Sequence, residues 1–124
     1  MVTTAPVKLV LEDPILGSTY GNGFLHINFP RHEIWGKPEN EWERIELTPT
    51  EFRLLIVFLR HPGLVLSRNH LADLVWPDED AMPENIRFHV NRLRHKIGES
   101  LIENVRSFGY RYVGHELAEG EKPS

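Results

Sequence analysis

Apolar residues recur at helical spacing in the middle of the chain, directly after a recognisable helix start. Thr48, Pro49 and Glu51 are the residue types of a capping box with proline at the first helical position. His61-Pro62-Gly63 ends the apolar run. We therefore predict a helix from 49 to about 60, whose apolar positions include Phe52, Leu55, Ile56 and Leu59.

Two further helices are predicted after a short segment, 64–66, which is too short for a helix and reads as a linking strand. Ser67 is a favourable N-cap for the second helix, and Trp76-Pro77 ends it. A loop over 77–82 leads to Pro83, which begins a third helix that reaches about Ile97-Gly98. The inner positions of the second helix are Leu71, Leu74 and Val75.

Short runs that favour strands flank the helical region on both sides. Upstream, 7–11, 24–29 and 44–47 are separated by turn formers, which predicts a small antiparallel sheet. Downstream, 101–105 and 110–113 flank the turn Ser107-Phe108-Gly109, which predicts a hairpin. The expected fold class is α+β, with an N-terminal antiparallel sheet, a three-helix core and a C-terminal β-hairpin.

The third helix has two unlike faces when it is placed on a helical wheel. Its core stripe is Ile86, Val90, Leu93 and Ile97. The opposite face carries Glu84, Asn85, Phe88, Asn91, Arg92 and His95, with His89, Arg94 and Lys96 at the margins.

Phe88 is unusual on that outer face, where a purely structural helix would have a polar residue. Asn and Arg around it are the side chains best shaped for bidentate contact with adenine and guanine edges. The combination favours a helix that enters the major groove of DNA. The alternative is that Phe88 packs against the hairpin or the long loop and that the charges are a solvated face.

The charge distribution supports a basic surface late in the chain. The 124 residues have a net charge of −4, but residues 82–113 carry six basic and three acidic side chains, a net +3. Arg106, just before the hairpin turn, fits a narrow minor groove. As an alternative, Arg106 is a turn residue that faces solvent.

Several motifs occur in the order found in one known domain. They are Leu47-Thr48-Pro49-Thr50-Glu51-Phe52, Pro62-Gly63 with Val65-Leu66-Ser67-Arg68, Leu74-Val75-Trp76, Val90-Asn91-Arg92-Leu93-Arg94, and Val105-Arg106-Ser107-Phe108-Gly109-Tyr110-Arg111. This pattern resembles the winged helix-turn-helix DNA-binding domain of OmpR/PhoB-type response regulators, over about residues 24–113. Residues 1–23 are then an N-terminal extension or linker, and 114–124 a polar tail.

The resemblance implies sequence-specific binding of double-stranded DNA in transcription regulation, with the third helix in the major groove and the hairpin wing at the minor groove. Tandem sites, a monomer free in solution with head-to-tail pairing on DNA, and contact with RNA polymerase through 77–82 are also implied. The expected base-facing residues are Asn85, Arg87, Phe88, His89, Asn91 and Arg92. The expected backbone contacts are Arg68, Trp76, Arg94, Lys96, Asn104 and Tyr110, with Arg106 in the minor groove.

Some positions depart from the family's pattern. The family usually has arginine where Glu84 stands and aspartate where Arg87 stands, and an i,i+3 pair between the two would keep the local stabilisation. Asn91 replaces a position that is often basic, and Ser107 replaces a common glycine. A receiver domain would need about another domain's length, so this chain is either a regulator that acts without one or an excised effector domain.

Other classes of function find little support. The seven histidines form no HExxH motif and have no cysteine beside them, so we expect no metal and no other cofactor. The chain has no phosphate-binding loop or nucleophile elbow, and we expect no enzymatic activity. No signal peptide or membrane span is visible, so a cytoplasmic protein is expected. The rival hypothesis is a protein-interaction module on a winged-helix scaffold, which a net acidic surface would suit.

Overall fold

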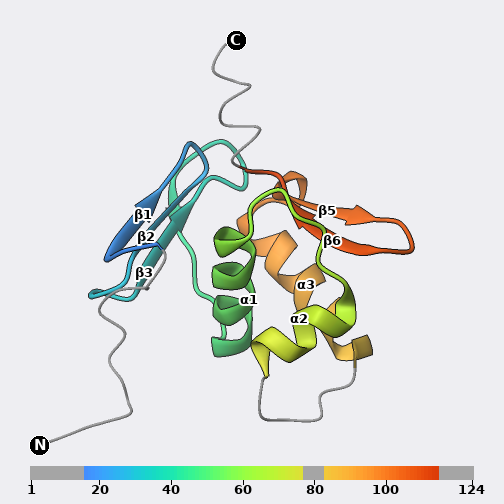
Figure 1. The fold of residues 1–124 in the computed structure, drawn as a ribbon. Coiled ribbons are helices and arrows are strands. Elements are labelled where there is room, and N and C mark those ends of the chain that lie inside the picture. The colour runs from blue at the N-terminus through green and yellow to red at the C-terminus, as the bar shows by residue number, and fades with distance from the viewer. Residues whose placement is uncertain (1–15, 77–82, 115–124) are drawn as a thin grey trace, which may run out of the picture.

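The computed structural model describes residues 16–76 and 83–114, without the side chains of 83 and 84. A four-stranded sheet lies on one side of helix α1, and helices α2 and α3 and a two-stranded hairpin lie on the other (Figure 1). The predicted strand over 7–11, the loop over 77–82 and most of the tail fall outside the described residues. No helix in 16–76 or 83–114 is long and apolar enough to cross a lipid bilayer.

The N-terminal sheet is an antiparallel meander in the order β1-β2-β3-β4. Its strands are β1 (Thr19–Gly21), β2 (Leu25–Asn28), β3 (Glu33–Gly36) and β4 (Glu43–Arg44). The run predicted at 24–29 contains β2, whereas only Arg44 of the run predicted at 44–47 lies in a strand, the two-residue β4. Strands β1 and β3 were not predicted, and β1 places part of the expected extension over 1–23 within the sheet.

The three helices form as the sequence predicts because their ends are fixed locally. Helix α1 (Pro49–Arg60) has the full capping box: Glu51 N–H donates to Thr48 Oγ1, and Thr48 N–H donates to Glu51 Oε1. Ser67 Oγ accepts from His70 N–H at the start of α2 (Arg68–Val75). Helix α3 (Pro83–Ile97) follows the undescribed loop.

The apolar faces of these elements meet in one core. Leu74, expected on the inner face of α2, is a correction: it is exposed, and Leu71, Ala72 and Val75 form that face instead. The predicted stripe of α3 is fully buried, at 1% exposure or less for Ile86, Val90, Leu93 and Ile97. Helix α3 packs against both α1 and α2. The core therefore fixes which face of α3 points outward.

The C-terminal wing consists of β5 (Ile102–Val105) and β6 (Gly109–Tyr112), after the short 3-10 helix η2 (Glu99–Leu101). Leu66 and Tyr110 exchange both backbone hydrogen bonds, at 2.8 and 2.9 Å, so the predicted linking strand is a single bridge that ties the wing to the start of α2. Tyr112 is buried, its hydroxyl accepts from Asn22 Nδ2 at 3.1 Å, and burial raises its pKa. The wing base is thus attached to both the helices and the N-terminal sheet.

Candidate nucleic-acid interface

The outward face of α3 carries the side chains predicted to read bases. Asn85, Arg87, Phe88, Asn91 and Arg92 are exposed, and His89 is half-buried. Phe88 is 58% exposed, so it does not belong to the core. The long loop over 77–82, which was one of the alternatives for its packing, lies outside the described residues. The structure thus gives α3 a polar outer face with an exposed aromatic residue on it.

An aromatic cluster occupies the middle of this face. The His89 ring lies edge-on to Phe88 at 5.3 Å and to Trp76, at the end of α2, at 5.6 Å between centroids. The Arg92 guanidinium carbon lies 5.5 Å from the Phe88 ring centroid, within cation–π range. These ring and cation contacts restrict the side-chain conformations of Phe88, His89 and Arg92 in the free domain.

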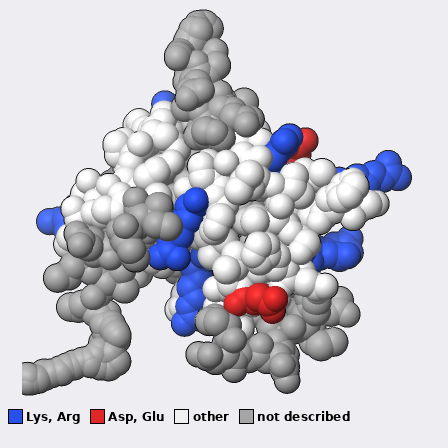
Figure 2. Space-filling model, viewed as in Figure 1, with Lys and Arg blue, Asp and Glu red and all other residues white. Residues whose placement is uncertain are grey.

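A polar hollow of about 420 Å³ lies between the start of α2, α3 and the wing. Arg68, Arg87 and Arg106 line it together with Asn69 and Asn104, and none of its lining residues is acidic. The N-terminus of α2 opens into it, and helix N-termini attract phosphate groups. In Figure 2, Lys and Arg side chains project at the right of the view, where the wing lies in Figure 1. The hollow therefore suits a polyanion.

The wing turn places Arg106 at the tip of the hairpin. Phe108 N–H donates to Val105 O at 2.9 Å, which closes a turn whose central residues are Arg106 and Ser107. Both side chains are exposed, and Ser107 has a positive φ of 69°. Arg106 thus extends beyond the body of the domain, as a residue that enters a groove must.

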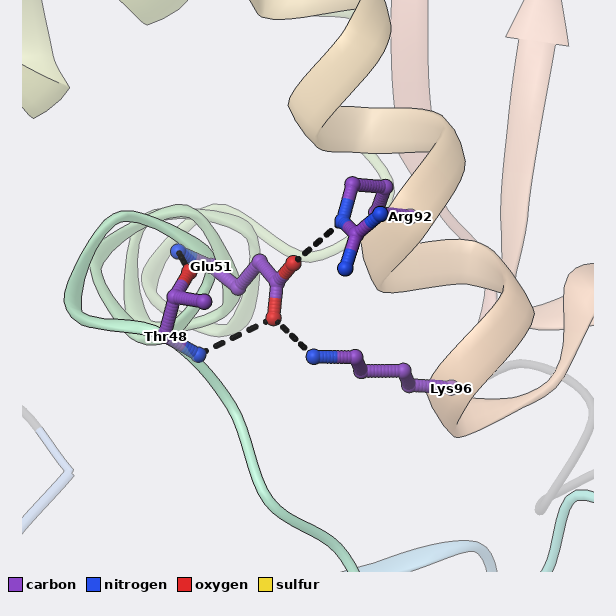
Figure 3. A network of polar contacts seen from close by, with 4 residues as sticks. All are labelled: Thr48, Glu51, Arg92 and Lys96. Carbon is purple, nitrogen blue, oxygen red and sulfur yellow. Dashed lines mark hydrogen bonds and ion pairs between the residues drawn. The ribbon is translucent and has the colours of Figure 1, made fainter.

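Glu51 joins the N-terminus of α1 to the outer part of α3 (Figure 3). Arg92 Nε lies 3.3 Å from Glu51 Oε2, and Lys96 Nζ lies 2.7 Å from Oε1. Glu51 is 1% exposed, while the side chains of Arg92 and Lys96 are 51% and 27% exposed. One buried carboxylate therefore pairs with two cations of α3.

The pKa of Glu51 lies below its ordinary value. Burial by itself would raise this pKa, but hydrogen bonds from Lys96, from the Thr48 backbone and from Arg92 outweigh burial. Glu51 is therefore ionised at neutral pH. The sequence indicated its capping role, but its partners lie 41 and 45 residues away, and nothing local indicated them.

The residues expected at the DNA backbone lie in different surroundings. Arg68 and Asn104 are exposed in the polar hollow, Trp76 is half-buried, and half-buried Arg94 donates from Nη2 to Glu99 O at 3.4 Å. Tyr110 is only 4% exposed, yet it lines the polar hollow with Arg68 and Asn104, so its expected backbone contact stays a prediction. The ammonium of Lys96 is directed to Glu51 rather than outward. Asn69, which was not among the expected contacts, also lines the hollow, and its position directly after the first residue of α2 could have indicated this.

Sheet, helices and wing together form a winged helix-turn-helix fold. Residues 42–112, more than half of the chain, match the family described as "Transcriptional regulatory protein, C terminal". The chain belongs to this family, and the resemblance to OmpR/PhoB-type effector domains is confirmed.

Relatives and solved structures agree with this assignment. The transcriptional regulatory protein CseB of Streptomyces coelicolor is 48% identical over 68 residues, which are 54% of this chain and 29% of CseB. The DNA-binding domain of the response regulator AdeR, solved with an intercistronic region, is 27% identical with a TM-score of 0.64, covering 79% of this chain and 100% of that one. The DNA-binding domain of CpxR from E. coli is 31% identical with a TM-score of 0.62, covering 78% and 97%. The chain thus spans less than a third of CseB but nearly the whole of the isolated domains.

Proposed function

We propose that this domain binds double-stranded DNA sequence-specifically in transcription regulation, with α3 in the major groove and the wing at the minor groove. Asn85, Arg87, Phe88, His89, Asn91 and Arg92 face bases; Arg68, Trp76, Arg94 and Asn104 contact the backbone; Arg106 enters the minor groove. Lys96 and Tyr110 are also proposed for the backbone, although the first pairs with Glu51 and the second is mostly buried where it lines the hollow. The similar AdeR domain, whose crystal structure is a complex with an intercistronic region, supports this proposal.

One observation carries the proposal: the outer face of α3 and the arginine-lined hollow are continuous through Arg87. Arg87 is exposed on α3 and also lines the hollow beside Arg68 and Arg106. A duplex whose major groove receives α3 would therefore bring phosphates to the hollow. The net charge of −4 does not oppose this, because exposed charges beyond about 8 Å are largely screened at physiological salt.

The rival function, a protein-interaction module, would gain if the carboxylates of Glu84 and Glu99 interrupted this surface. The side chain of Glu84, and with it the expected pair with Arg87, lies outside the described part of the chain. Glu99 does not interrupt the surface, because it lies beyond the C-terminal end of α3, with Oε2 3.9 Å from His95 Nδ1, and it does not line the hollow. Among the described side chains that line the hollow, none is a carboxylate. DNA is therefore the better-supported partner.

The test begins with selection from a library of randomised duplexes, followed by fluorescence anisotropy on the preferred sequence at several salt concentrations. The logarithm of affinity should fall linearly with the logarithm of salt, by about 0.9 per phosphate contact. Arg68→Ala should weaken binding to all sequences and reduce this slope by about one contact. Equal binding to random and selected duplexes would refute sequence specificity.

Arg53→Ala is the matched control. Arg53 is exposed on α1, where it lines a different hollow with Phe29 and Phe52, so its loss changes the net charge equally. If Arg53→Ala weakens binding as much as Arg68→Ala, the effect is one of total charge and the proposed surface is wrong. On a duplex with two copies of the preferred sequence, two domains should bind in tandem, while the free domain should sediment as a monomer.

A further inference from the structure

The guanidinium of Arg92 is held on two sides while half of its side chain stays in solvent. Its Nε lies 3.3 Å from Glu51 Oε2, and the Phe88 ring lies 5.5 Å from the guanidinium carbon. Within the described part of the chain, the two terminal nitrogens, Nη1 and Nη2, have no hydrogen-bond partner. Glu51 therefore occupies the Nε of Arg92, and the Nη1 and Nη2 edge of the guanidinium remains available to a ligand.

The carboxylate that holds Arg92 is itself fixed. Glu51 Oε1 accepts from Lys96 Nζ at 2.7 Å and from Thr48 N–H at 3.0 Å, and the residue is the third of α1 (Figure 3). A carboxylate with these three partners, almost without solvent exposure, cannot follow the movements of a surface arginine. The orientation of Arg92 is thus set by the start of α1, a helix that carries none of the proposed base-facing residues.

An arginine can read guanine with two parallel N–H bonds, and these come either from Nε with one terminal nitrogen or from both terminal nitrogens. Because Glu51 occupies Nε, the second arrangement is the one available to Arg92. An arginine held in this way also loses less rotational freedom when it binds than a free one does.

We propose that Glu51 is a positioning residue for sequence recognition, which fixes Arg92 so that Nη1 and Nη2 read a guanine edge in the major groove. The inference rests on the proposed DNA-binding function and adds to it a specificity-determining residue outside α3. A purely structural role for the same ion pair would stabilise the domain and leave base discrimination unchanged.

The experiment compares base discrimination among variants. Selection from randomised duplexes gives a preferred sequence for the wild type, and Arg92→Ala identifies the base pair whose preference depends on Arg92. The ratio of Kd values for the changed and the preferred base pair at that position is then measured for each variant. A bidentate contact should give the wild type a ratio of roughly 5- to 150-fold.

Glu51→Gln is the main variant, because glutamine can still close the capping box while the charge that holds Arg92 is lost. We expect its discrimination at the Arg92 position to fall at least threefold, with discrimination at other positions unchanged. Thr48→Ala is the matched control: it removes the cap hydroxyl and lowers stability but keeps both carboxylate–cation pairs, so its ratio should stay within twofold of the wild type. Circular dichroism confirms that each variant is folded at the assay temperature.

Each result decides something different. If Glu51→Gln keeps the wild-type ratio, or if Thr48→Ala loses it equally, Glu51 acts only through stability and the inference is wrong. If Arg92→Ala changes no base preference, Arg92 does not read bases, and the inference fails while DNA binding stands. If the wild type prefers no sequence at all, the proposed function itself fails. Should Glu51→Gln not fold, Glu51→Asp, which keeps the charge but is one methylene shorter, should show the same loss of discrimination.

Discussion

Gly109, at the start of β6, is where the structure makes its most demanding prediction about the wing. Its φ is +148°, and a Cβ atom added there would lie 2.1 Å from the carbonyl oxygen of Leu66. That oxygen accepts the hydrogen bond from Tyr110 N–H that ties the wing to α2. Gly109→Ala therefore cannot be accommodated unless the wing moves away from Leu66.

The cost follows from the bonds that such a movement breaks. Loss of the two Leu66–Tyr110 backbone hydrogen bonds should cost about 1 kcal/mol each. A non-glycine residue in this region of φ adds about 1–3 kcal/mol of strain if the backbone keeps its conformation. We expect about 3–5 kcal/mol of lost stability, which lowers the Tm by roughly 10–25 °C for a domain of this size. DNA affinity should fall as well, because the wing carries Arg106.

Gly98→Ala separates strain from displacement of the wing. Gly98 also has a positive φ, +123°, but its added Cβ would meet other atoms only at the ordinary contact distance of 3.8 Å. Urea and thermal unfolding, followed by circular dichroism, should show a smaller loss for Gly98→Ala than for Gly109→Ala. Equal losses would refute the reasoning, because backbone strain alone would then account for both.

Three further outcomes are expected. Phe88→Ala should cost less than about 1 kcal/mol of stability, because the ring is mostly exposed, yet weaken DNA binding; a large drop in Tm would instead place Phe88 in the core. Ser107→Gly should raise the Tm by a few degrees in thermal unfolding. Glycine relieves about 1–2 kcal/mol of left-handed strain at φ 69°, and this exceeds the about 0.5–1 kcal/mol that it loses to chain entropy. A lower Tm would contradict the turn geometry. Because the pKa of Glu51 is lowered in the folded state, its charge stabilises the domain above the ordinary pKa of about 4.5, and this stabilisation is lost as the pH falls through the lower folded value. In urea unfolding, the stability difference between wild type and Glu51→Gln should therefore shrink below pH 4.5. A difference that stays constant with pH would show that the charge contributes nothing.

The sequence by itself determined the elements whose signals are local. The capping box of α1 and the N-cap of α2 involve hydrogen bonds across three residues, so residue types at fixed spacing suffice to predict them. The buried stripe of α3 follows from helical periodicity, which also separated the outward face with Phe88 from the core. The hairpin was predicted in the same way, from a turn between two short alternating runs.

Only the tertiary structure decided the features that depend on distant partners. Strand β3 has two inward positions, Ile34 and Gly36, and β1 is three residues long, so neither has enough pattern to be predicted without the β2 strand beside it. The burial of Tyr110 depends on the bridge to Leu66, which lies 44 positions earlier in the chain. The pairing of Glu51 with Arg92 and Lys96 arises because α1 packs on α3. Hydrogen bonds within a turn are encoded by neighbouring residues, whereas the partner of a buried charge is chosen by the packing of whole helices.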